Sequence, residues 1–242
     1  MRDSVGREHR TVTRVTTILE AAASHAEGVK LTTLSALLDA PKSSVHGLVS
    51  GLLATGYLLE RDGGYVLGPA VSLLPQPSKP SVLAHARRSL ETLEAQSHET
   101  STLSLLVGGS VVYVDIFESR QSIRYSAPLR VRRPLYPTSS GKCFLAYMPA
   151  GQRDSYLNET INDATALDKV REELDSVRRD GVAYNRGETV PDVFAVASPV
   201  IVRTRVVACL SIAGPSQRME AALDSLAQIV HEEAQRLAGS AR

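Results

Sequence analysis

The clearest periodic pattern in the chain lies between Asp39 and Leu58, in "DAPKSSVHGLVSGLLATGYL". Apolar residues fall there at i, i+3, i+4, i+7 and i+8, which is one face of a helix; they are Val45, Leu48, Val49, Leu52 and Leu53. The opposite face carries short polar side chains, glycine and a single cation: Lys42, Ser43, Ser44, His46, Gly47 and Ser50. A solvated face usually pairs opposite charges along the helix, so this pattern favours a face that contacts another molecule.

Two further helices are expected before this one, in "TVTRVTTILEAAASHAEG" and "KLTTLSALLDAP". After it, "GYLLERDGGYVLGP" predicts two strands joined by the hairpin turn "DGG". The order helix, helix, three-residue turn, helix, hairpin is that of a winged helix-turn-helix, whose second helix enters the major groove of DNA.

A winged helix predicts a set of DNA contacts. Lys42 and the N–H groups at the helix start suit phosphates, and Ser43, Ser44 and His46 are short enough to reach base edges. The full set of expected DNA-binding residues is Arg10, Arg14, Thr33, Lys42, Ser43, Ser44, His46, Ser50 and Arg61.

The charge balance of residues 1–74 leaves a second interpretation open, in which the polar face of this helix contacts only solvent. Residues 1–74 contain seven basic and seven acidic side chains, whereas DNA-binding domains usually carry a basic surplus. Four of the basic residues, Arg2, Arg7, Arg10 and Arg14, fall in the first fourteen residues, where an arm would reach the backbone or minor groove. A single copy is expected to bind DNA weakly, and a dimer would compensate.

Proline marks the boundary between two parts of the chain. Pro75, Pro77 and Pro80 lie within six residues and exclude both helix and central strand. The expected organisation is therefore a DNA-binding domain over residues 1–74, a proline-rich linker over 75–80 and a second domain over 81–242.

The second domain is expected to be α+β. A helix in "SVLAHARRSLETLEAQSHE" precedes two strands that meet at Gly108-Gly109, and "SIRYSAPL" is expected to form a third strand. A helical region from "SSGKCFLAYMP" to "DKVREELDSVRRDG" leads to strands in "VFAVASPVIV" and "RVVACLSIAGP" and to a closing helix. Strands paired as hairpins with helices at the ends predict an antiparallel sheet that encloses a small-molecule pocket.

Composition narrows the classes of protein. Of the 242 residues, 43% are hydrophobic and 22% charged, as in globular proteins. Cys143 and Cys209 both lie in apolar runs, which indicates reduced thiols in a core, and no metal-ligand spacing occurs. No apolar run approaches 18 residues and no leader follows the first charges, so we expect a cytoplasmic protein without a membrane partner, metal or cofactor.

The ordered set "TSSGKCFLAYMP", "VRRDGVAYNRGE", "VFAVASPVIV" and "VVACLSIAGP", after a wing and a linker helix, resembles the IclR family of bacterial transcriptional regulators. The resemblance covers nearly all of residues 10–240. It implies a winged helix-turn-helix domain and an effector-binding domain of GAF-like α/β fold. It also implies a homodimer or homotetramer on a palindromic operator, and a ligand-responsive regulator, here expected to be a repressor of metabolic genes.

The resemblance also implies an effector site. The family's ligand lies at the start of the "GK" helix, here Ser139, Ser140 and Gly141, whose N–H groups suit a carboxylate. Ser211 and Tyr125 would complete the wall. The chain has Asn185 where the family can have an acid, and Phe194 where it can have a small residue. A bulkier, less polar pocket for an aromatic or larger organic acid is expected, unless Phe194 is a core residue and the serines are helix caps.

Two short motifs suggest other functions. Ser139 and Lys142 fit S-x-x-K, the nucleophile motif of serine β-lactamases, but the S-D-N and K-T-G elements of that hydrolase chemistry are missing, so an enzyme is not expected. Alternatively, the run Arg130–Arg133, "RVRR", would serve a ligand-independent interaction protein as a docking patch, or be a solvated loop.

Overall fold

A computed structural model describes residues 9–74 and 81–240, and the chain divides into two compact units, Met1–Pro77 and Ser78–Arg242. The proline-rich stretch 75–80 and the first eight residues, with Arg2 and Arg7, lie outside the described residues. No helix among the described residues is long and apolar enough to cross a membrane.

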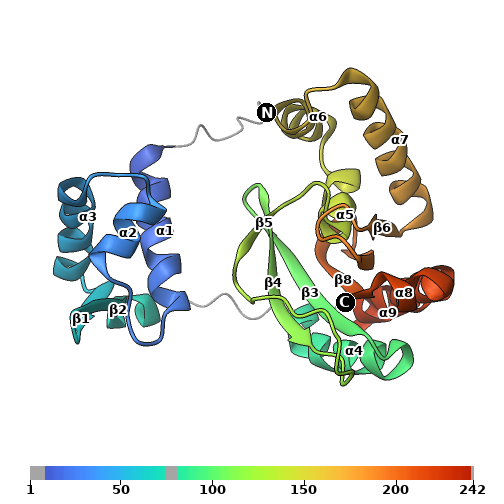
Figure 1. Ribbon diagram of the computed structural model, residues 1–242, viewed down its shortest axis with the longest axis horizontal. Helices are drawn as coiled ribbons and strands as arrows, with labels where there is room; N and C mark the ends of the chain where they lie inside the picture. Colours follow the sequence, from blue (N-terminus) through green and yellow to red (C-terminus); the bar gives the residue numbers. More distant parts are fainter. Residues whose placement is uncertain (1–8, 75–80, 241–242) are drawn as a thin grey trace. The chain divides into compact units, whose positions relative to one another are not determined.

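The N-terminal unit has the order of elements that the sequence predicts (Figure 1). Its elements are α1 (Arg10–Ser24), α2 (Leu31–Leu37), α3 (Lys42–Ala54), β1 (Leu58–Arg61), β2 (Gly64–Leu67) and the 3₁₀ helix η1 (Pro69–Leu73). At the hairpin tip Asp62 and Gly63 have φ of 51° and 74°, and Arg61 pairs with Gly64. Two successive residues with positive φ between paired strands form the tight turn that "DGG" predicts.

The apolar face of α3 anchors this unit. Val45 and Val49 are fully buried, together with Ile18 of α1 and Leu34 of α2. Pro41 sits directly before the helix, where its missing N–H costs nothing. The three helices therefore share one small core, and the outer face of α3 takes no part in it.

The C-terminal unit is an antiparallel sheet between two layers of helices. Its elements are α4 (Ser81–Ser97), β3 (Thr100–Val107), β4 (Ser110–Phe117), β5 (Arg132–Pro134), α5 (Ser139–Tyr147), α6 (Ala150–Thr160), α7 (Ala164–Asp180), β6 (Ala183–Arg186), β7 (Val193–Val202), β8 (Arg205–Pro215), α8 (Ser216–Met219), η2 (Glu220–Ala222) and α9 (Leu223–Ser240). The strand order is β5-β4-β3-β8-β7-β6, and every neighbouring pair is antiparallel. This confirms the expected α+β class.

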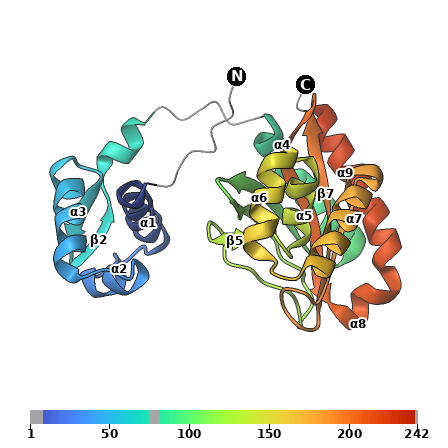
Figure 2. The ribbon, with the colours of Figure 1, turned by 90° about the horizontal axis from the view of Figure 1, so that it is seen from above.

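Two separate cores result from the alternation of side chains along the central strands. Val196 of β7 and Leu210 of β8 pack against α4 and α9 on one face of the sheet. Ala197 and Cys209, each one residue away, pack against α5 and α7 on the other. Figure 2 shows α5 on one side of β7 and α9 on the other.

One expected strand is wrong. "SIRYSAPL" is an irregular segment, and the edge strand is β5, whose Arg133 pairs with Val111 of β4. Pro128 has no backbone N–H to donate to a neighbouring strand. The Tyr125 carbonyl accepts a hydrogen bond from the Thr100 side chain, Oγ1, at 2.6 Å rather than from the backbone of a strand. The short strand β6 was not anticipated, since four residues carry little periodic signal.

Candidate functional site

The outer face of α3 is exposed along its whole length. Val45, Val49 and Leu52 turn inward, while the expected contact residues all face solvent: Lys42, Ser43, Ser44, His46 and Ser50. No side chain caps the helix start at Pro41. The first-turn N–H groups and the positive end of the helix dipole are thus available to an anion such as a DNA phosphate.

Glycine keeps this face flat. A Cβ built on Gly47 or Gly51 meets nothing within 4 Å, so neither glycine is demanded by packing inside the unit. Each glycine costs about 1 kcal/mol of helix stability relative to alanine. A residue that lowers stability without serving the fold points to a role in close approach by a partner.

The remaining DNA candidates lie on other elements of the N-terminal unit. Arg10 and Thr33 are exposed and Arg14 is half-buried, on α1 and α2; Arg10 and Arg14 line a shallow groove with Leu38. Arg61 is exposed beside the hairpin turn. The unit therefore presents cations on α1, at the start of α3 and at the wing.

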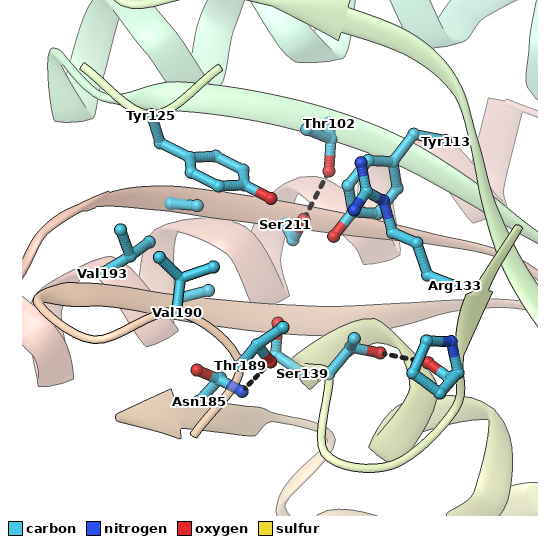
Figure 3. Close-up of a pocket in the computed structure, with 14 residues that line it drawn as sticks. Thr102, Tyr113, Tyr125, Arg133, Ser139, Asn185, Thr189, Val190, Val193 and Ser211 are labelled. Carbon is cyan, nitrogen blue, oxygen red and sulfur yellow. Dashed lines mark hydrogen bonds between the residues drawn. The ribbon is translucent and has the colours of Figure 1, made fainter. Parts of the chain in front are cut away.

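A cavity opens in the C-terminal unit on the α5 face of the sheet (Figure 3). It offers about 80 Å³ to the centre of a water-sized sphere, several times the roughly 10–15 Å³ that one water needs. Its lining comes from β3 to β8, the start of α5, the irregular segment before β5 and the loop between β6 and β7: Thr102, Tyr113, Tyr125, Arg133, Pro134, Thr138, Ser139, Asn185, Thr189, Val190, Val193, Ala195, Ser211 and Ala213.

Small residues in adjacent strands create this space. Ala195 of β7 lies opposite Ala213 of β8, and Thr102 of β3 lies opposite Ser211 of β8. All four project from one face of the sheet, beyond the start of α5. Larger side chains at these positions would fill the cavity, as they do on the opposite face of the sheet.

Hydroxyl groups and one cation give the cavity its polarity. Thr102 Oγ1 and Ser211 Oγ lie 2.6 Å apart and share a hydrogen bond. Burial raises the pKa of the Tyr113 hydroxyl, and its neighbour Tyr125 raises it further, so this hydroxyl stays protonated. The Arg133 guanidinium lies 4.7 Å from the centre of the Tyr113 ring.

Four of the seven residues expected at the effector site line this cavity: Tyr125, Ser139, Asn185 and Ser211. Asn185 Nδ2 donates at 2.7 Å to the Pro137 carbonyl and to Thr189 Oγ1. The structure thus brings together residues that lie 86 positions apart in the sequence, from Tyr125 to Ser211.

The other three do not line it. Phe194 was expected to enlarge the pocket wall, but it alternates with Val193 and Ala195 and packs against the core on the opposite face. Gly141 is a packing requirement, because a Cβ there would collide with the Leu135 carbonyl. Ser140 is buried beneath the helix start. The cap of α5 is Thr138, whose Oγ1 accepts from Gly141 N at 3.1 Å, rather than either serine.

Lys142, the lysine of the S-x-x-K pattern, is a structural residue. Its ammonium is 1% exposed and donates to Glu173 Oε1 at 2.7 Å, to Glu188 Oε2 at 2.8 Å and to the Tyr184 carbonyl at 2.9 Å. These partners occupy all three of its protons. A lysine whose ammonium is engaged by two carboxylates and a backbone carbonyl is not available as the base for a serine nucleophile, which argues against the hydrolase.

The "RVRR" run does not form one exposed patch. Arg130 is exposed with φ of 60°, and the Arg132 side chain reaches the Val107 carbonyl at 2.9 Å. Arg133 turns the other way and lines the cavity. The alternation of β5 separates the two neighbouring arginines.

Sequence reasoning missed most of the cavity wall. Arg133 was assigned to a surface patch, and Thr102, Tyr113, Thr189 and Ala195 were not considered. The hairpin pattern predicted strands at some of these positions, but only the register between strands shows which residues face one another. Among the described residues no group of three His, Cys, Asp or Glu is placed to hold a metal ion.

Comparison with known proteins places both units in one family. Residues 78–238 match the bacterial transcriptional regulator IclR C-terminal domain, and residues 11–62 match the IclR helix-turn-helix domain. The chain is 26% identical over 196 residues to TtgV of Pseudomonas putida, an HTH-type transcriptional regulator, covering 78% of this chain and 75% of that one. It is 30% identical over 220 residues to SauR of Cupriavidus necator, a transcriptional regulator by name, covering 84% of each.

Solved structures agree. An IclR transcriptional regulator from Silicibacter sp. TM1040 is 27% identical, covers 96% of each chain and superposes with a TM-score of 0.78. An IclR homologue from Microbacterium hydrocarbonoxydans, crystallised with 4-hydroxybenzoate, shares the fold with a TM-score of 0.76 at 20% identity, covering 96% of this chain and 99% of that one. This chain therefore belongs to the IclR family of bacterial transcriptional regulators, which join a helix-turn-helix DNA-binding domain to an effector-binding domain and are not enzymes.

Proposed function

We propose that this protein is a repressor of metabolic genes that releases a palindromic operator when it binds an organic acid. As a homodimer or homotetramer it presents two recognition helices to successive major grooves, one helical turn of DNA apart. Lys42 and the start of α3 contact phosphates, and Ser43, Ser44 and His46 contact base edges.

The observation that carries this proposal is the outer face of α3. It is exposed, nearly free of charge and lined with serine and glycine directly after a tight turn. A helix face of this kind contributes nothing to its own unit, and its flatness suits close approach to the floor of a groove. The exposed cations Arg10, Lys42 and Arg61 of the same unit would contact phosphates.

The effector in this proposal is a carboxylate in the cavity lined by Tyr125, Ser139, Asn185 and Ser211. The homologue crystallised with 4-hydroxybenzoate supports an aromatic acid as one class of ligand for this fold. Ligand binding would favour one of two arrangements of the recognition helices, by its difference in affinity for the two.

The test is a gel shift of the purified protein on the intergenic DNA upstream of its own gene. We expect retardation that survives unrelated competitor DNA and weakens steeply between about 50 and 200 mM salt, as phosphate contacts require. Absence of a shift at low salt, with the protein folded and dimeric, would overturn the proposal and favour a docking protein.

A further inference from the structure

Arg133 is an uncompensated charge at the cavity. Among the described residues that line the cavity it is the only one with a charged side chain. No carboxylate of the described residues lies within 4 Å of its guanidinium, which donates from Nη2 to the Pro128 carbonyl at 3.4 Å. Its Nε is shielded from solvent and has no hydrogen-bond partner. Such a group is costly in a folded protein unless something supplies the missing acceptor.

Other cations of the C-terminal unit have a carboxylate partner, which Arg133 lacks among the described residues. Arg218 donates to both oxygens of Glu99, at 2.5 and 2.9 Å, and Arg87 donates to Asp115 at 3.0 Å. Lys142 is enclosed by Glu173 and Glu188. These three cations, two of them exposed and one buried, are thus paired with carboxylates of their own unit, whereas half-buried Arg133 is left for a carboxylate from outside.

The guanidinium is held in position before any ligand arrives. β5 pairs Arg133 with Val111 of β4, and the side chain stacks on the Tyr113 ring. Figure 3 shows Tyr125 and Arg133 pointing into the cavity from opposite sides, with Ser211 between them. A planar donor fixed by stacking loses little freedom on binding, which favours a two-pronged contact with a carboxylate.

The rest of the wall determines the body of the ligand. Val190, Val193, Ala195 and Ala213 form an apolar side, and the Tyr125 ring lies across from Arg133. A flat ring suits a space between aromatic and aliphatic walls. With one cation and no second charge in the lining, a dicarboxylate or a phosphate dianion would bury an unpaired negative charge.

We infer that the effector is an aromatic monocarboxylate whose carboxylate binds Arg133 and whose ring lies between Tyr125 and the valine and alanine side of the cavity. This inference rests on the proposed function, because a bound acid is an effector only if it controls DNA binding. It assigns the anion to β5, whereas the sequence alone placed it at the start of α5.

The experiment is calorimetric titration of the full chain with single-ring acids and their carboxamides: benzoate, 4-hydroxybenzoate and phenylacetate, each beside its neutral amide. At least one acid should bind, and its amide should bind roughly 10- to 100-fold more weakly, the loss of one charge-assisted contact. Arg133→Gln should remove that preference, bringing the acid down to the affinity of the amide.

Arg132→Gln is the matched control, because Arg132 neighbours Arg133 on β5 but turns away from the cavity; it should leave both affinities unchanged. Arg133→Lys keeps the charge and loses the fork, so it should retain an intermediate preference for the acid, and it replaces the Gln variant if that one does not fold. Failure of every acid to bind, or an acid that binds Arg133→Gln as tightly as the parent, would overturn the inference.

A gel shift separates the two proposals. If acid binding depends on Arg133 but the protein does not retard DNA, the proposed repressor function is wrong and the inferred ligand class is still supported. If the protein retards DNA but binds none of the acids, the inferred ligand class is wrong and the proposed DNA binding is still supported.

Discussion

The outer face of α3 and the cavity of the C-terminal unit are built in opposite ways. The helix carries its contact residues within thirteen consecutive positions, Lys42–Ala54, all on the exposed side. The cavity collects its lining from residues 102 to 213, across β3 to β8 and the start of α5. One site is local and needs only a helix to exist, whereas the other exists only when the whole unit has folded.

The two sites also differ in whether their cations are paired with carboxylates. On α3 the cation Lys42 is exposed and solvated until a partner arrives. In the C-terminal unit Lys142 is enclosed by carboxylates of its own unit, whereas Arg133 at the cavity forms no ion pair with a carboxylate among the described residues. Substitutions on the exposed face of α3 should leave the fold intact, whereas removal of Lys142 would leave two carboxylates without their shared cation and disturb the structure beside the cavity.

The largest effect is expected from Lys142→Met. The substitution leaves Glu173 and Glu188 facing each other without their shared cation, which should cost about 3 kcal/mol of unfolding free energy. Since Glu188 is next to Thr189 and Val190 in the cavity lining, affinity for the acid should fall too. Urea unfolding and calorimetric titration measure the two effects.

The control for Lys142→Met neutralises the carboxylates as well. Adding Glu173→Gln and Glu188→Gln should recover most of the lost stability, because no unpaired charge remains. Recovery of less than half would show that the lysine stem, rather than its charge, stabilises the unit. The N-terminal unit should unfold as before in both variants.

The next effect is on the local site. Ser44→Glu puts a carboxylate in the first turn of α3, where it should be tolerated by the helix but repelled by phosphates. We expect operator binding to weaken by about 100-fold or more, equivalent to about 2.7 kcal/mol, with unfolding and acid binding unchanged. Gel shift and circular dichroism melting follow the two properties.

Thr16→Glu is the matched control, since it adds the same charge to an exposed position of the same unit, on α1. It should weaken operator binding by only a few-fold, through long-range repulsion that salt screens. If the two variants lost affinity equally, net charge and not the face of α3 would govern DNA binding.

How much the sequence predicts follows from the same contrast. Helical periodicity identified α3, its buried residues and its exposed face, because a helix face is decided by neighbours three and four positions away. Pro41 and "DGG" placed the turn and the wing through rules of backbone conformation. For the C-terminal unit the fold class was predicted from apolar strand runs that pair as hairpins, with helices at the ends.

The cavity was only partly predictable, because its members meet through strand register. Phe194 was assigned to the wall, but a shift of one position on a strand exchanges the two faces of the sheet. Arg133 was read as part of a basic surface run, since nothing local shows that β5 turns it inward. Ser139 and Asn185 were found only through the family resemblance.

Substitutions at neighbouring positions of β7 test which face of the sheet each residue occupies. Ala195→Leu should fill the cavity and weaken acid binding by at least about 10-fold, a steric block of an occupied site. Phe194→Leu should leave acid affinity within about two-fold and lower stability by about 1 kcal/mol, because it removes core packing on the other face. Titration of both variants with the same acid gives the comparison.

Equal loss of acid affinity in both variants would contradict the placement of Phe194 on the far face. A normal affinity in Ala195→Leu would mean that the acid binds elsewhere. Either result would return the helix start at Ser140 and Gly141 to consideration as the anion site.

The smallest effect is expected from Gly47→Ala, at the exposed face of α3. A methyl group there meets nothing within 4 Å, and alanine favours the helix by about 1 kcal/mol. We expect the unfolding free energy to rise by about that amount. We also expect operator affinity to fall several-fold, because the added methyl group holds the helix away from the groove floor.

Opposite signs for stability and affinity are what distinguish a residue kept for its partner from one kept for the fold. Gly51→Ala, one turn further along the same helix and equally open, provides the comparison within α3. Its stability gain should match that of Gly47→Ala, and its loss of affinity should be smaller, because it lies further from the helix start that enters the groove. An unchanged affinity in Gly47→Ala would mean that this position does not approach the groove floor closely. In that case Gly47→Arg should tighten operator binding by adding a phosphate contact.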